Sequence, residues 1–97
     1  MTLWIDALKK KIRRIVKVEM EKVLKRKVDV RVLRIDFSRV RTDLSGTGRE
    51  GVEVELAVRP VGEEGEIPCI AVFDILPFMV NERKPPRLLQ LFIGCLR

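Results

Sequence analysis

Residues 3–27, LWIDALKKKIRRIVKVEMEKVLKRK, decide how the rest of the chain must be arranged. Wound as an α-helix at about 100° per residue, this stretch gathers its apolar side chains in one arc of roughly 160° and most of its cations on the other side. The apolar arc holds Trp4, Ile5, Leu8, Ile12, Ile15, Val16, Met20 and Val23. A helix of this length would be about 36 Å long, enough to cross a small sheet. We therefore expect it to cover a sheet with its apolar face.

The residues that follow alternate between apolar and polar side chains, which is the period of a β-strand. Residues 28–41 predict one long strand, but the alternation changes parity at Val32 and Leu33, which indicates a β-bulge. Residues 52–58 alternate valine and leucine with glutamate and alanine, and these glutamates can face arginines of the preceding strand. Residues 67–76 are apolar at both parities, as is typical of a strand covered by its neighbours.

The last segment of the chain has an apolar pattern that fits two structures. From Arg87 onward the apolar residues recur with helical spacing, and Pro86 suits the first turn of a helix. The recurring residues are Leu88, Leu91, Phe92, Cys95 and Leu96. Gly94 and the shortness of the segment weaken a helix over 87–96, so a final strand stays open as the alternative.

These elements predict a single α+β domain over residues 1–97, in the order helix, three strands, helix. The simplest layered arrangement is a three-stranded antiparallel meander sheet, covered on one face by the long N-terminal amphipathic helix, with a short C-terminal helix. Double-stranded-RNA-binding domains and restriction-nuclease-like cores share this order of elements. An order of elements does not decide function, so the site residues must do so.

The charge of the chain is distributed unevenly along the sequence. The net charge is +6, but residues 1–41 carry 14 Lys and Arg against 5 Asp and Glu. Residues 42–80 carry 2 against 8, and residues 81–97 carry 4 against 1. The chain is thus basic, then acidic, then basic, which favours an anionic partner or an electrostatically matched contact between copies.

Several classes of site are excluded by composition. The chain has no histidine, so it can hold neither a His-ligated metal nor a Ser-His-Asp triad. Cys69 and Cys95 stand in apolar surroundings without a CxxC motif, which indicates two buried thiols in a cytoplasmic protein. A disulfide between them stays open, because a charged content of 35% with few amides is typical of proteins from hot environments.

Catalysis is not expected, and neither is a cofactor or a metal. A nuclease-like site needs carboxylates and a lysine on the sheet, for which Glu19, Asp43, Glu53 and Glu55 are the acidic candidates. No lysine occurs between residues 27 and 84, so the lysine of such a site is missing. Asp74 is expected to cap the turn that follows its strand.

The basic side of the first helix is the strongest candidate for a binding site. Cations spaced by three and four residues on one helix face can bind successive phosphates and release their counterions. A second basic group precedes the predicted C-terminal helix, whose N-terminus would favour phosphate. The candidate nucleic-acid-binding residues are Lys10, Arg13, Arg14, Lys17, Arg83, Lys84 and Arg87. The expected function is sequence-independent binding to the backbone of DNA or RNA, because the aromatic content of 5% without tyrosine offers little for base stacking.

Apolar segments of the chain suggest two other partners, a lipid surface and a second copy of the chain. A basic amphipathic helix with Trp4 near its start could lie on anionic lipid, but its apolar face is needed to cover the sheet, so a membrane is not expected. A homo-oligomeric structural subunit with no nucleic-acid role is the alternative function. The C-terminal segment is more apolar than one buried stripe requires, which predicts a homodimer. The expected interface residues are Leu88, Leu89, Phe92, Ile93 and Leu96.

Overall fold

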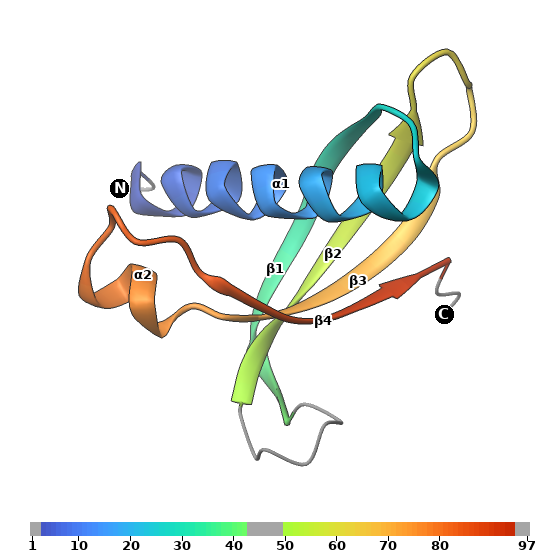
Figure 1. Ribbon diagram of the computed structural model, residues 1–97. Coiled ribbons are helices and arrows are strands. Elements are labelled where there is room, and N and C mark those ends of the chain that lie inside the picture. Colours follow the sequence, from blue (N-terminus) through green and yellow to red (C-terminus); the bar gives the residue numbers. More distant parts are fainter. Residues whose placement is uncertain (1–2, 43–49, 95–97) are drawn as a thin grey trace.

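The computed structural model describes residues 3–42 and 50–94 of the chain and shows a long helix lying across a four-stranded sheet (Figure 1). The elements in chain order are α1 (Leu3–Leu24), β1 (Val28–Thr42), β2 (Glu50–Pro60), β3 (Ile67–Asp74), α2 (Leu76–Val80) and β4 (Arg87–Ile93). The strands lie in the order β1-β2-β3-β4, and each is antiparallel to the next. The predicted α+β class, the meander and the covering N-terminal helix are therefore confirmed.

The core lies between α1 and one face of the sheet. Leu8, Ile12, Val16 and Met20, which recur every four residues along α1, are fully buried. They belong to one cluster with the helix-facing residues of the sheet, which include Val28, Val30, Val54, Leu56, Val58, Ala71 and Phe73. The buried stripe is shorter along the helix than predicted, because Trp4 near the start of α1 and Val23 near its end are exposed.

α1 ends earlier than the sequence pattern predicted. The prediction ran to Lys27, whereas the helix stops at Leu24 and Lys25 adopts a φ of 56°. A residue in the left-handed region interrupts the helical hydrogen bonds and turns the chain toward the first strand. The three cations at 25–27 therefore lie in the turn between α1 and β1.

β1 contains the predicted irregularity. The register with β2 shifts between Val32 and Arg34, so Leu33 is the extra residue. The shift keeps Val32 and Ile35 on the side of the main core, although they differ in parity. A second shift between Asp36 and Val40 was not predicted.

On β1 and β2, the sheet face that points away from α1 carries charged side chains that pair across the strands. Arg34 Nε lies 3.0 Å from a carboxylate oxygen of Glu55, its register partner on β2. Arg59 and Asp29, which are also register partners, lie 3.1 Å apart. The expected cross-strand pairing of the β2 glutamates with β1 arginines is thus confirmed for Glu55.

The predicted C-terminal helix is wrong, and the alternative of a final strand is right. Residues 87–93 form β4, which pairs with β3 from Cys69 to Asp74. The outer edge of β3 would otherwise leave its backbone N–H and C=O groups without partners, and a neighbouring strand satisfies them. Gly94 adopts a φ of 70°, and its N–H donates to the carbonyl of Pro68.

The short helix α2 was not predicted. The sequence predicted a strand over residues 67–76, but β3 ends at Asp74 and Pro77 lies in the first turn of α2, where proline needs no hydrogen-bond partner. Asp74 Oδ1 accepts a hydrogen bond of 3.0 Å from the N–H of Leu76, so the expected capping role of Asp74 is confirmed. A helix of five residues is too short to give a periodic signal.

A corner between α1 and β1 fixes the angle of the helix on the sheet. Glu21 Oε2 accepts hydrogen bonds from Lys17 Nζ at 2.7 Å and from the N–H of Val28 at 3.2 Å. Lys17 Nζ also donates to the carbonyl of Val28 at 2.9 Å. The hydrogen bond from Lys17, followed by that from Val28, holds the pKa of Glu21 below its ordinary value.

The helix–sheet seam predicts which truncations destabilise the protein. Ile12→Ala and Leu56→Ala should each lower the free energy of unfolding by about 2–5 kcal/mol, because each empties a fully packed position. Val18→Ala is the matched control on α1, since Val18 is exposed and its loss should change stability by less than about 0.5 kcal/mol. Urea unfolding measures all three. Equal small losses at Ile12 and Val18 would show that the packing face is misassigned.

The corner predicts a pH dependence. Because the pKa of Glu21 is lowered in the folded state, its ionised form stabilises the fold above the ordinary carboxyl range near 4.5, and this contribution is lost as the pH falls through the lowered value. Glu21→Gln should therefore lower the melting temperature at pH 7, and the gap to the parent should close in acid. Glu64→Gln, at an exposed turn position, should show no gap at either pH. A Glu21→Gln gap that persists unchanged to pH 2 would contradict the role of the carboxylate.

Candidate nucleic-acid interface

Three hollows follow the basic side of α1, and Arg13 lines all of them. Two of them, of about 470 and 460 Å³, lie between α1 and the outer strand β1. The third, of about 560 Å³, lies along the first half of α1. We name this surface the basic groove. Its cations on α1 are Lys9, Lys10, Arg13, Arg14 and Lys17; Asp6 and Ala7 line its end, and residues 29–32 of β1 lie opposite.

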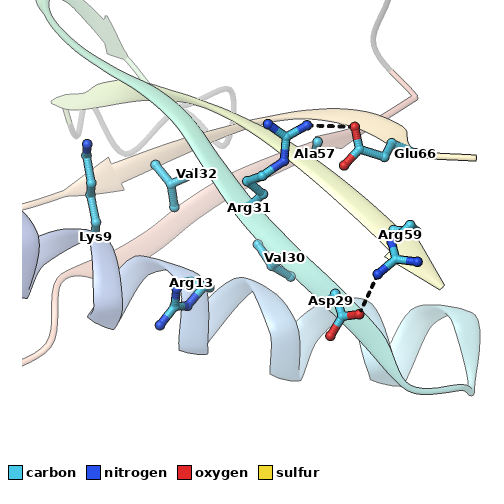
Figure 2. A pocket seen from close by; sticks show the side chains of 9 residues that line it. All are labelled: Lys9, Arg13, Asp29, Val30, Arg31, Val32, Ala57, Arg59 and Glu66. Atoms are coloured by element: carbon cyan, nitrogen blue, oxygen red, sulfur yellow. Dashed lines mark hydrogen bonds and ion pairs between the residues drawn. The ribbon is translucent and has the colours of Figure 1, made fainter. Parts of the chain in front are cut away.

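Four cations of α1 differ from the other cations of the groove, because they have no acidic partner in the described part of the chain. Within residues 4–37 and 51–94, no ion pair joins a carboxylate to Lys9, Lys10, Arg13 or Arg14. The groove residues on the strands are neutralised instead (Figure 2): Arg31 pairs with Glu66 at 2.8 Å, and Arg59 pairs with Asp29 at 3.1 Å. Lys9, Lys10, Arg13 and Arg14 therefore form a cluster of uncompensated positive charge on the first half of α1.

The fold produces this concentration directly. Lys9 and Arg13 are one helical turn apart, and so are Lys10 and Arg14, so each pair lies on one line along the helix. The buried stripe of α1 turns these lines toward the border with β1 and away from the core. In Figure 2, Val30 and Val32 of β1 lie beside them and supply an apolar wall to the groove.

Lys17 lines the groove as predicted, but its ammonium group is already engaged. It forms the corner with Glu21 and Val28, where its role is to hold α1 against β1. We therefore separate Lys17 from the four unpaired cations. Its replacement would change stability as well as charge.

The second predicted basic group lies elsewhere. Arg83, Lys84 and Arg87 are exposed, but none of them lines a hollow of the basic groove. Their neighbour Glu82 lines a hollow with Trp4, at the beginning of α1. The argument from a helix N-terminus at Arg87 is wrong, because residues 87–93 form a strand.

Three cations that line the hollows of the groove were not among the predicted site residues. Lys9 could have been found, because it lies four residues before Arg13 on the same helix. Arg31 and Arg59 are brought to the groove by the register between β1 and β2. The turn before β3 then places Glu66 against Arg31. No local pattern carries that information.

The carboxylates considered for catalysis do not gather into a site. Glu53 is buried in β2, while Glu19 lies at the rim of α1, 3.8 Å from Lys22. Asp43 lies outside the described residues. Among residues 3–42 and 50–94, no group of three or more Asp, Glu or Cys side chains is placed to hold a metal ion.

The predicted interface residues form part of β4. Leu88 packs against the main core, Leu89 and Phe92 are half-buried, and Ile93 is exposed. Leu96 lies outside the described residues, as does Cys95, whereas Cys69 is buried in the core. β4 pairs with β3, and Leu88 and Leu91 pack against the core. The apolar side chains of the segment are therefore partly covered within the chain.

Neither helix of the described chain is long and apolar enough to cross a bilayer. Comparison of the sequence with protein-family models finds no match, and no curated protein or solved structure matches the chain. The function is therefore argued from the geometry of the basic groove.

Proposed function

We propose that this protein binds the sugar–phosphate backbone of nucleic acid through the basic groove, without sequence preference and without catalysis. The observation that carries the proposal is the contrast between the two sets of cations. Arg31 and Arg59 of the groove are paired with carboxylates, whereas Lys9, Lys10, Arg13 and Arg14 have no acidic partner in the described chain. A charged face that served solubility alone would mix both signs, as the strands do.

Phosphate binding suits this group of cations on physical grounds. Four like charges on two turns of a helix repel one another, so an anion that neutralises them lowers the electrostatic free energy of the folded chain. A nucleic-acid backbone also gains from the release of its condensed counterions. Arginine can hold one phosphate with two parallel hydrogen bonds, while lysine acts as a point charge.

The outer position of β1 adds a second source of contacts. An edge strand leaves half of its backbone N–H groups without a ladder partner, and backbone N–H groups are common donors to phosphate oxygens. Residues 29–32 of this strand line the basic groove together with the cations of α1. The groove thus offers charged and neutral donors to the same anion.

The absence of sequence preference follows from what lines the groove. Base recognition in single strands uses stacking on exposed aromatic rings. The rings of Trp4 and Phe37 have centroids 5.9 Å apart and pack on each other, and neither residue lines the basic groove. The side chains available there recognise charge and not base identity.

The proposal predicts how binding depends on salt. The parent protein should bind a mixed-sequence duplex with a dissociation constant that is micromolar or weaker, and the logarithm of its affinity should fall linearly with the logarithm of salt concentration. The triple variant Lys10→Gln, Arg13→Gln, Arg14→Gln should reduce the magnitude of that slope by about 2–3, because up to three phosphate contacts are lost. Fluorescence anisotropy with labelled DNA and RNA duplexes measures both quantities.

The matched control removes the same charge from the other basic group. In the triple variant Arg83→Gln, Lys84→Gln, Arg87→Gln, the net charge falls equally, but the slope should stay close to that of the parent. All six substituted side chains are exposed, so thermal stability should be preserved in both variants. Equal slopes in the groove variant and the parent, or equal losses in the two variants, would contradict a site in the basic groove.

A further inference from the structure

The short helix α2 is apolar on both sides. Phe78 is only 1% exposed and packs into the core, while Leu76, Met79 and Val80 on the other side are 63, 62 and 77% exposed. Single exposed apolar residues are ordinary, but three on one helical turn are not. The helix therefore presents an apolar surface that the described chain does not cover.

This surface continues beyond α2. Met79 lines one hollow of about 230 Å³ with Val52, Phe73 and Leu76, and a second hollow of about 300 Å³ with Trp4 and Phe78. The ring of Trp4 in turn packs on that of Phe37, which is also exposed. We name the surface the apolar tip, and it comprises Trp4, Phe37, Leu76, Met79 and Val80. In Figure 1, α2 lies at the end of the molecule where α1 begins.

The apolar tip is held in one conformation by polar contacts at both ends of α2. Asp74 accepts a hydrogen bond from the N–H of Leu76, and Asn81 Oδ1 accepts one from the N–H of Arg83 at 3.0 Å. The N–H groups of Met79 and Asn81 donate to the carbonyls of Ile75 and Pro77. The exposed side chains thus project from a fixed turn, which lowers the entropy lost when a partner covers them.

The size of the apolar tip matches a protein contact. With about 200 Å² for each large side chain, its five residues expose on the order of 500 Å² of mostly apolar surface. That is near the upper end for the largest patch of a monomer. Together with a polar rim it would provide roughly the 800 Å² per partner of a standard interface.

The shape of the tip favours a second copy of the chain over a lipid surface. A bilayer has no fixed relief, whereas the tip combines protruding side chains such as Val80 with apolar hollows on either side of Met79. In a two-fold contact the protruding residues of one protomer face the hollows of the other, so the same patch supplies both halves.

We propose that the apolar tip is a self-complementary contact through which two copies of this chain form a two-fold dimer. The contact is distinct from the expected interface on β4. It shares no residue with the four unpaired cations of the basic groove, so each dimer would present two grooves. The proposal does not depend on nucleic-acid binding, and either can fail without the other.

Sedimentation velocity on nucleic-acid-free protein tests the proposal. At concentrations of about 1 to 100 μM the parent should sediment at about twice its 11.2 kDa chain mass. Val80→Asp should weaken the dimer at least about tenfold, and the double variant Met79→Asp, Val80→Asp should be monomeric over this range. Val61→Asp is the matched control, because Val61 is exposed in the turn after β2, and it should remain dimeric.

Ile93→Asp separates this contact from the alternative on β4, and it should also remain dimeric. Circular dichroism checks that each variant is folded. If the double variant is unfolded, the sedimentation of Val80→Asp alone tests the proposal, because Val80 lines neither hollow. A monomeric parent, or a dimer that survives both tip variants, overturns the proposal. So does a dimer that Ile93→Asp alone abolishes. A monomeric parent that pellets with phosphatidylglycerol vesicles, and stops doing so in the double variant, overturns it in favour of a lipid surface.

Discussion

The packing of one apolar stripe of α1 against the sheet is the constraint on which the rest of the structure depends. Leu8, Ile12, Val16 and Met20 fill that seam completely, and they fix the rotation of α1 about its own axis. Once that rotation is fixed, the cations between and beside these residues must emerge at the border with β1. The corner formed by Lys17, Glu21 and Val28 then fixes the crossing of helix and strand. The basic groove is therefore a consequence of core packing and needs no separate folding signal.

The same packing explains why the charges of this protein fall into two kinds. A strand residue acquires a cross-strand neighbour through the sheet register, so the register can pair Arg34 with Glu55 and Arg59 with Asp29. A residue on the outer side of a helix has no cross-strand neighbour and finds an ionic partner only along its own helix, as Lys17 does in Glu21. The unpaired cations of α1 are satisfied by water or by a bound anion. The proposed function uses this difference, because a polyanion replaces the partners that the fold cannot supply.

The sequence predicted those elements whose signal is local and long. The 3.6-residue period of residues 3–24 and the alternation of residues 52–58 each identify one element and its buried face. The parity change at Val32 and Leu33 even located the bulge. The prediction failed at 87–96, where apolar residues at nearly every position satisfy a helix and a strand equally well. The strand is selected by the free edge of β3, which is a tertiary interaction.

The candidate site was predictable only in part for the same reason. Lys10, Arg13 and Arg14 are neighbours on one helix, and their spacing in the sequence predicts this. The separation of Arg83, Lys84 and Arg87 from the groove follows from the course of the chain after β3, which the sequence does not state. The apolar tip was missed because α2 is too short to have a period. The structure is needed to show that Phe78 is buried while Leu76, Met79 and Val80 are exposed.

The central claim is that the unpaired cations of α1 and the outer edge of β1 together form one anion-binding surface. The most direct measurement is a titration of ¹⁵N-labelled protein with a short mixed-sequence duplex, followed by amide chemical shifts. The account predicts fast-exchange shifts concentrated in residues 9–14 of α1 and 29–32 of β1, with residues 76–80 of α2 unmoved. Shifts centred on the charged sheet face opposite α1, or on residues 81–87, would contradict it. So would a spectrum that does not change at millimolar duplex, where non-specific phosphate binding must be evident.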